Sequence, residues 1–243
     1  MNGWRSVGQV MSRPFHVKLR FLLVPAALCL SGLAGGAETP DAREILKSVR
    51  AAQTGQQQSL NGKVRSGWKS VPFKLTMTGN TVRWEFSDPP QTLQLQLGEK
   101  SAQFEEIGKG GAQKVAAARF DEKVRDTDIS YEDLSMRFLY WPDATVEGDE
   151  TMLMQSCWVV HVEAPSKDAS QYSKVKLWIT KNGGALMQAE AYGHDGKLAR
   201  RFKVISGQSL GDGLWMLKQM RIEQMTAGAD KTPSYLEVEK PEK

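Results

Sequence analysis

The chain has 243 residues with 32 Lys and Arg against 28 Asp and Glu, a formal net charge of +4. Arg5, Arg13, Lys18 and Arg20 all precede the first acidic residue, Glu38, so the remainder of the chain carries 28 charges of each sign. A balanced chain lacks the positive field that nucleic acid binding requires, which excludes that class of function.

Residues 1–37 have the layout of a secretory signal peptide. The basic residues lead into an apolar run, Phe21 to Leu33, and the small residues Gly35 and Ala37 suit a signal peptidase. The run has about 13 residues, whereas a membrane-spanning helix needs ~20. We therefore expect cleavage and export, with residues 38–243 forming a single domain. A leader kept as a membrane anchor is the alternative.

The two cysteines indicate no internal disulfide in the mature chain. Cys29 lies in the leader, and lipid attachment there is disfavoured because Leu28 stands where a lipobox has Gly or Ala. Cys157 lies in an apolar stretch, which predicts a buried, inert thiol.

A helix is predicted at the start of the mature chain. Thr39 is a suitable cap, Pro40 suits the first helical position, and Ile45, Leu46 and Val49 form one apolar stripe.

Most of the remaining chain alternates between apolar and polar residues as strands do. Leu93, Leu95 and Leu97 are the clearest case, and glycine-containing turns such as Asp195-Gly196 separate successive runs. The polar stretch 53–59 is expected to be a loop. Predicted strands cover residues 71–78, 81–86, 91–97, 101–106, 157–163, 174–180, 185–192, 197–205, 214–225 and 233–239.

A second, short amphipathic helix is predicted between the two groups of strands. Ser130 and Asp133 form a capping box, and Pro142 forces an end. Its apolar side consists of Tyr131, Leu134 and Phe138. The predicted fold is mainly β with two or three helices: a curved, unclosed antiparallel barrel whose apolar concave face the helices partly cover.

Sequence motifs typical of catalytic sites are present, but the residues that they need as partners are missing. Residues 207–211 match G-x-S-x-G, but a strand follows them and the last histidine, His194, precedes the serine, so a glycine-rich hairpin connection is expected. The acid pair Glu132-Asp133 is explained by helix capping. We expect no enzymatic activity.

Metal sites are disfavoured on similar grounds. A calcium loop starting at Asp126 would have Tyr131 and Arg137 where Gly and Glu are needed. His161 and His194 have no metal-ligand spacing around them, so no metal and no cofactor are expected.

The apolar face of the sheet is the candidate binding site. The sequence is rich in Trp and Met, and a curved sheet with short helices covers less apolar surface than it displays, which predicts a partly vacant cavity. A one-residue shift in register would invert the contribution of any strand. The candidate lining, chosen by strand alternation, is Phe73, Leu75, Met77, Trp84, Phe86, Leu93, Leu95, Leu97, Leu177, Ile179, Met216, Met220 and Ile222.

Several motifs resemble those of the periplasmic outer-membrane lipoprotein-sorting proteins, the LolA-like carriers. The resemblance is strongest from Asp128 onward. Its motifs are Asp133-Leu134-Ser135, Phe138-Leu139-Tyr140-Trp141-Pro142, Cys157-Trp158, Tyr172-Ser173-Lys174-Val175, Leu177-Trp178-Ile179, Ala191-Tyr192 and Asp195-Gly196-Lys197-Leu198.

This resemblance implies an unclosed β-barrel with a helical lid that shields lipoprotein acyl chains, or other lipid, on the way across the periplasm toward the outer membrane. It implies a monomer that receives cargo from an inner-membrane release complex and passes it to an outer-membrane acceptor. In the best-known members a basic residue in the barrel holds the lid shut. The alternative is an envelope sensor or scaffold on the same fold that binds a protein partner.

Overall fold

The computed structural model describes residues 39–211, 214–226 and 232–239. The expected leader, residues 1–37, lies outside them, so cleavage and export remain predictions. The described residues belong to one compact unit that begins at Thr39. None of the helices in this described part is long and apolar enough to cross a membrane.

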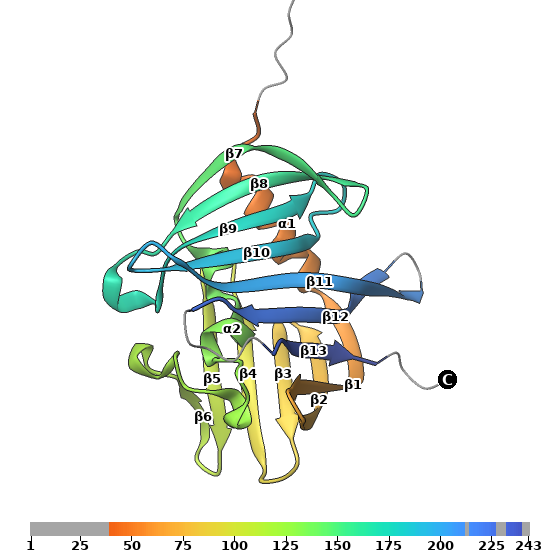
Figure 1. The fold of residues 1–243 in the computed structure, drawn as a ribbon. Coiled ribbons are helices and arrows are strands. Elements are labelled where there is room, and N and C mark those ends of the chain that lie inside the picture. The colour runs from red at the N-terminus through yellow and green to blue at the C-terminus, as the bar shows by residue number, and fades with distance from the viewer. Residues whose placement is uncertain (1–38, 212–213, 227–231, 240–243) are drawn as a thin grey trace, which may run out of the picture. The chain divides into compact units, whose positions relative to one another are not determined.

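A single antiparallel sheet of 13 strands dominates the unit (Figure 1). Its order is β6-β5-β4-β3-β2-β1-β13-β12-β11-β10-β9-β8-β7, so β6 and β7 are the two edges and the sheet is not closed. This confirms the predicted fold class. The strands are β1 (Gln56–Ser66), β2 (Lys69–Gly79), β3 (Thr81–Phe86), β4 (Gln91–Leu97), β5 (Ala102–Gly108), β6 (Gly111–Lys114), β7 (Asp143–Met152), β8 (Gln155–Glu163), β9 (Tyr172–Thr180), β10 (Leu186–Gly193), β11 (Leu198–Gly211), β12 (Leu214–Gln224) and β13 (Ser234–Val238).

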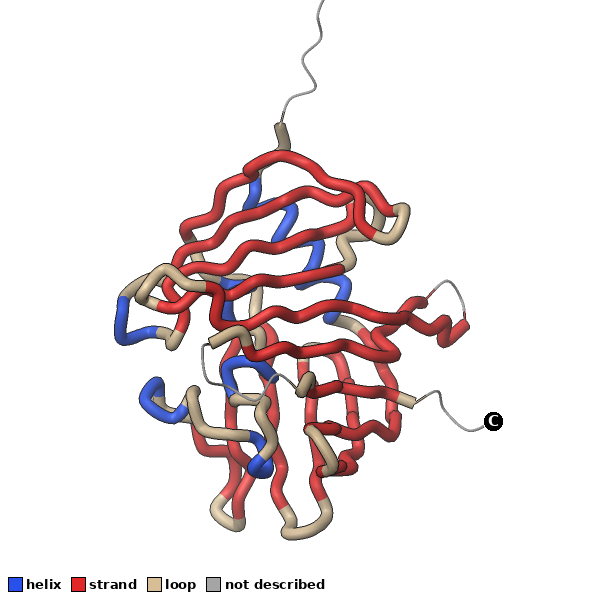
Figure 2. Tube along the Cα trace, viewed as in Figure 1, coloured by secondary structure: helices blue, strands red, loops and turns tan. Residues whose placement is uncertain are grey.

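The connection between β6 and β7 runs from one edge of the sheet to the other. Every other pair of consecutive strands is adjacent in the sheet, while β1 pairs with β13 in its middle. We call residues 115–142, which make this connection, the crossing segment. It contains only short helical turns separated by loops (Figure 2): η1 (Ala117–Arg119), η2 (Val124–Asp126), α2 (Tyr131–Ser135) and η3 (Arg137–Tyr140).

The first helix, α1 (Ala42–Gln53), begins later than predicted. Asp41, and not Thr39, is its cap, because the Asp41 carboxylate accepts a hydrogen bond from the Arg43 backbone N–H. Ile45, Leu46 and Val49 are buried as predicted, and α1 packs against β7 and η3. Figure 1 shows α1 behind β8 to β11, on the inside of the curved sheet.

All ten predicted strands are present. The bounds of β3 and β4 are as predicted, the other eight have shifted ends, and three further strands were missed. Within the stretch 53–59, expected to be a loop, residues 56–59 instead form the start of β1, where none of the four polar side chains is buried. The edge strands β6 and β7 also escaped prediction, since none of their side chains is fully buried. The predicted hairpin connection at 207–211 is wrong, because β11 continues through Gly211.

Gly62 allows three strands to pack closely in the middle of the sheet. It pairs with Phe73 on β2 and with Val238 on β13. A Cβ atom at this position would lie 2.5 Å from the Phe73 ring and 2.6 Å from the Glu237 carbonyl oxygen. Neither the Glu237 backbone nor the packed Phe73 ring can move far. Any residue larger than glycine therefore forces the strands apart at this position.

Gly62→Ala should therefore lower the free energy of unfolding by about 1–3 kcal/mol, the usual cost of overpacking. Urea unfolding followed by circular dichroism measures it. The control is Gly108→Ala, on β5, where a Cβ atom meets nothing within 4 Å. Equal effects of the two substitutions would contradict the account.

Candidate functional site

The candidate lining residues share one face of the sheet. Twelve of the thirteen are buried members of a single hydrophobic core, and Met216 packs against that core. The same core contains Ile45, Leu46 and Val49 of α1, which identifies this face as the inner, concave one. Trp178, between Leu177 and Ile179 on β9, belongs instead to a small cluster with Cys157 and Val159 on the outer face. Whether the thirteen residues contact a ligand remains a prediction.

The crossing segment covers this concave face with its own apolar side chains. The Tyr131 ring lies 5.5 Å from that of Phe104 on β5, and the Phe138 ring lies 6.1 Å from that of Phe202 on β11, measured between centroids. The sequence predicted a partly vacant face, whereas in this structure the face is covered. The buried apolar residues of the crossing segment are Val115, Phe120, Val124, Ile129, Tyr131, Leu134, Phe138, Leu139 and Trp141.

Asp133 fixes α2 through four interactions. The predicted capping box is confirmed: the Ser130 hydroxyl accepts from the Asp133 N–H, and the Asp133 carboxylate accepts from the Ser130 N–H at 2.9 Å. The same carboxylate accepts a hydrogen bond from the Tyr172 hydroxyl at 2.5 Å and pairs with Arg200 at 3.2 Å. The Asp133 side chain is completely buried. The cap of the helix is thus also its attachment to the sheet.

Arg200 attaches the crossing segment to β11. Besides pairing with Asp133, its guanidinium donates a hydrogen bond of 2.6 Å to the Asp128 carbonyl oxygen. Burial by itself would lower the pKa of Arg200, but the Asp133 carboxylate, together with Tyr172 and Asp128, outweighs burial and the pKa is raised. A buried ion pair gains little net stability, yet removing one partner leaves the other charge uncompensated. The pair therefore acts mainly to specify where α2 lies.

Glu132 makes a second attachment, to the loop between β8 and β9. Its carboxylate accepts hydrogen bonds from the Ser170 hydroxyl at 2.6 Å and from the Gln171 backbone N–H at 3.1 Å. Burial raises the pKa of this carboxyl, although both hydrogen bonds oppose the shift. The sequence interpretation of Glu132-Asp133 as capping residues is thus right for Asp133 and wrong for Glu132. We call Glu132, Asp133, Ser170, Tyr172 and Arg200 the anchor cluster.

Sequence reasoning missed Arg200, although a signal was available. Arg200 has the same parity along β11 as the fully buried Phe202, so alternation places it on the concave face. An arginine at an inward position needs a carboxylate partner. The histidines, by contrast, make ordinary contacts: His161 pairs with Glu147 at 3.1 Å, and His194 lies 3.0 Å from the Ser170 carbonyl oxygen.

Cys157 is buried, and burial raises the pKa of its thiol. Among the described residues, His, Cys, Asp and Glu form no group of three or more that could hold a metal ion.

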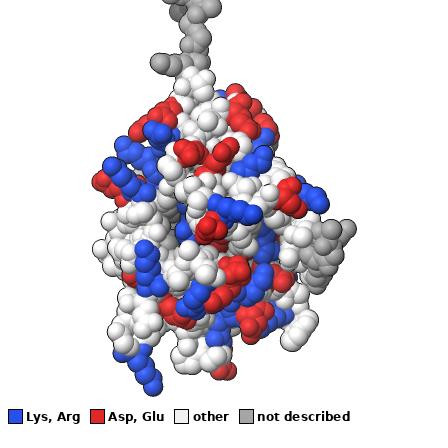
Figure 3. Space-filling model, turned by 90° about the vertical axis from the view of Figure 1, so that its left-hand side faces the viewer, with Lys and Arg blue, Asp and Glu red and all other residues white. Residues whose placement is uncertain are grey.

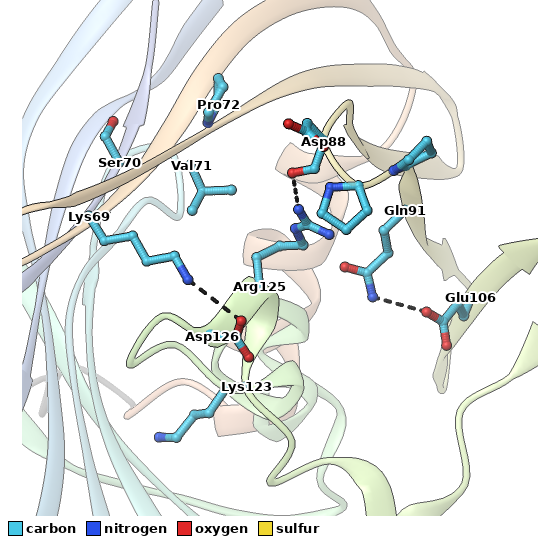
Figure 4. A pocket seen from close by; sticks show the side chains of 12 residues that line it. Lys69, Ser70, Val71, Pro72, Asp88, Gln91, Glu106, Lys123, Arg125 and Asp126 are labelled. Atoms are coloured by element: carbon cyan, nitrogen blue, oxygen red, sulfur yellow. Dashed lines mark hydrogen bonds and ion pairs between the residues drawn. The ribbon is translucent and has the colours of Figure 1, made fainter.

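A pocket of about 640 Å³ opens at one end of the concave face (Figure 4). The start of β2, the turn between β3 and β4, and η2 surround it. We call it the polar pocket, because its lining includes six charged residues. These are Lys69, Asp88, Glu106, Lys123, Arg125 and Asp126. None of the candidate lining residues belongs to this pocket.

A family model described as "-like: Uncharacterized protein" matches residues 111–242, more than half of the chain. The chain belongs to this family. The match spans the crossing segment and the strands from β7 onward, which contain the whole anchor cluster. Comparison with curated protein sequences finds no match.

Solved structures show what fold the family member has. An outer membrane lipoprotein-sorting protein domain from Vibrio parahaemolyticus has a TM-score of 0.61 at 15% identity, covering 81% of this chain and 89% of that one. A LolA superfamily protein from Nitrosomonas europaea has a TM-score of 0.59 at 12% identity, covering 83% of this chain and 92% of that one. A DUF1329 family protein from Desulfovibrio piger has a TM-score of 0.56 at 15% identity, covering 83% of this chain and 92% of that one. The chain therefore has a LolA-like fold, as the sequence resemblance predicted.

Arg200→Met should lower the free energy of unfolding by about 3–5 kcal/mol, because it leaves Asp133 buried without its counter-charge. The control is Arg201→Met, the next residue along β11. Its side chain is 32% exposed and pairs with Glu190, so its loss should cost under about 1 kcal/mol. Urea unfolding of both variants measures the difference, and similar losses would show that the buried pair has no special role.

Glu132→Gln should change how stability depends on pH. The pKa of Glu132 is raised above its unfolded value of about 4.3, so between the two pKa values the folded state holds more protons. The wild-type free energy of unfolding therefore falls as pH rises through this window, and the variant lacks that fall. We expect the difference, variant minus wild type, to increase with pH from about 4.3 upward.

The control for this pH experiment is Glu122→Gln. Arg119 lowers the pKa of the Glu122 carboxyl, so here the same difference should decrease as pH rises. Urea unfolding at a series of pH values measures both. If the difference in free energy of unfolding between Glu132→Gln and the wild type stayed constant with pH, the pKa of the buried Glu132 carboxyl would not be raised.

Proposed function

We propose that the protein carries acyl chains, of lipoproteins or of other lipids, on the concave face of its sheet. The observation behind this proposal is how that face is covered. Besides α1, the cover is the crossing segment, made of short helical turns and held through buried polar bonds to β11 and to the β8–β9 loop.

The crossing segment occupies the place that an acyl chain would take. Its apolar side chains belong to the same hydrophobic core as the candidate lining, so an entering chain would exchange one apolar contact for another. Each acyl methylene removed from water contributes about 0.8 kcal/mol. A long chain therefore supplies enough free energy to displace residues such as Phe138 and Trp141, provided that the polar anchors release.

The anchor cluster fits the role of a releasable latch. Arg200 extends from the barrel wall to Asp133 and to the Asp128 carbonyl oxygen, both in the crossing segment. This position supports giving Arg200 the role of the basic residue that the LolA-like resemblance implies. Polar bonds of defined geometry hold the closed position but exchange for water once the segment lifts, unlike a covalent bridge.

The leader predicts export, and an exported carrier would act in the space between the two membranes. The carrier works in the periplasm without catalysis, takes cargo at the inner membrane and releases it toward the outer membrane. Lysines and arginines are interspersed with acidic side chains on the face drawn in Figure 3, which suits an exterior that stays in water.

The test uses a brominated fatty acid, which quenches tryptophan fluorescence on contact. Trp84 lies in the concave core, whereas Trp178 lies in the outer cluster, and both are buried. We expect saturable quenching of the full mature chain. Trp84→Phe should remove part of the quenchable signal, and Trp178→Phe should leave that part intact.

The opposite pattern, or no saturable quenching, would contradict acyl binding on the concave face. Mass spectrometry of gently purified protein supplies an independent measurement, since a carrier should retain acyl species. A lipid-free protein that copurifies with a stable protein partner would favour the sensor or scaffold instead.

A further inference from the structure

The polar pocket adjoins the apolar stripe of the concave face. Pocket residues Val71 and Pro72 directly precede Phe73 on β2, and Gln91 lies two residues before Leu93 on β4. The Arg125 guanidinium lies 5.9 Å from the centroid of the Phe86 ring. A charged pocket thus lies next to an apolar surface. An amphiphile, which has a polar headgroup and apolar chains, requires this arrangement. Its volume of about 640 Å³ is within the range of small-molecule sites.

Two cations in the pocket have unused donors. Arg125 donates through one amino group to the Asp88 carbonyl oxygen, while its buried Nε has no partner among the described residues. The Lys123 ammonium donates to the Asp128 carbonyl oxygen at 3.3 Å, and burial together with nearby Arg200 lowers its pKa. A phosphate group offers several charged acceptors to such donors.

The acidic residues of the pocket balance its cations. Lys69, Lys123 and Arg125 face Asp88, Glu106 and Asp126, which are equal in number. Asp126 is fully exposed and makes only a loose pair with Lys69, at 3.6 Å. A purely anionic ligand would meet these carboxylates unfavourably, whereas a ligand that bears both charges can match both sets.

The backbone holds Arg125 and Asp126 in a costly conformation. Their φ angles are 52° and 54°, in the left-handed region that residues other than glycine rarely adopt. Strain of this kind costs about 1–3 kcal/mol per residue and gathers at ligand sites, because the surrounding structure must enforce it.

We infer that the polar pocket binds the zwitterionic headgroup of a phospholipid, with phosphate on Arg125 and Lys123 and ammonium on Asp126, while the acyl chains lie on the concave face. This inference rests on the proposed carriage of acyl chains and adds to it a class of cargo. A lipid without phosphate, such as a diacylglycerol, would bind through its chains alone.

The experiment compares short-chain phosphatidylethanolamine, phosphatidylglycerol and diacylglycerol on the full mature chain by calorimetry. Arg125→Asn should weaken both phospholipids about tenfold and leave diacylglycerol unchanged, since one charge-assisted hydrogen bond accounts for that factor. Asparagine tolerates a positive φ, so the variant should fold. Asp126→Asn should remove the preference for phosphatidylethanolamine over phosphatidylglycerol.

The control is Arg221→Asn on β12, another arginine whose Nε has no partner among the described residues but which lies outside the pocket. It should bind all three lipids like the wild type. Unchanged phospholipid affinity in Arg125→Asn, or an equal loss for diacylglycerol, would overturn the headgroup site while leaving acyl carriage standing.

Glycerophosphoethanolamine, which has no acyl chains, tests the pocket separately from the concave face. We expect it to perturb the NMR signals of Lys123 and Arg125 in the wild type, and those of Lys123 far less in Arg125→Asn. Absence of any perturbation in the wild type would also overturn the inference.

Discussion

The crossing segment is tied to the sheet by the buried pair between Asp133 and Arg200, and the rest of the structure depends on that tie. An unclosed sheet whose consecutive strands β6 and β7 form opposite edges needs a connection across its concave face. The short turns of that connection have few internal hydrogen bonds, so tertiary bonds must position them. Asp133 serves twice, as the cap of α2 and as the partner of Arg200.

Two kinds of interaction therefore share the work of closing the concave face. Burial of apolar side chains such as Phe138 and Leu139 supplies most of the free energy, but it is non-directional and would be served equally by a hydrocarbon guest. The anchor cluster supplies direction, because its ion pair and hydrogen bonds require defined positions. The crossing segment covers the concave face with apolar side chains but is attached to the sheet by polar bonds. This suits a binding protein that must both shield its cargo and release it.

The polar pocket extends the same logic to the end of the concave face. Phe73, Phe86 and Leu93 continue the apolar surface up to the pocket, where charged residues of both signs take over. The crossing segment contributes to both regions, since η2 lines the pocket and α2 covers the apolar face. Residues 123–133 thus join the two, with the Asp128 carbonyl oxygen bonded to Arg200 and the Asp128 carboxylate accepting a hydrogen bond from Ser66 at 2.7 Å.

The sequence alone determined whatever depends on neighbours along the chain. Alternation in Leu93, Leu95 and Leu97 placed the concave face correctly, and the spacing of Ser130 and Asp133 predicted the cap of α2. It could not reveal β7, an edge strand with little to bury, nor how completely the concave face is covered. Only the tertiary structure decided that Arg200 meets Asp133, because residues far apart in the chain become neighbours through the order of the strands, and a charge pattern carries no record of its distant partner.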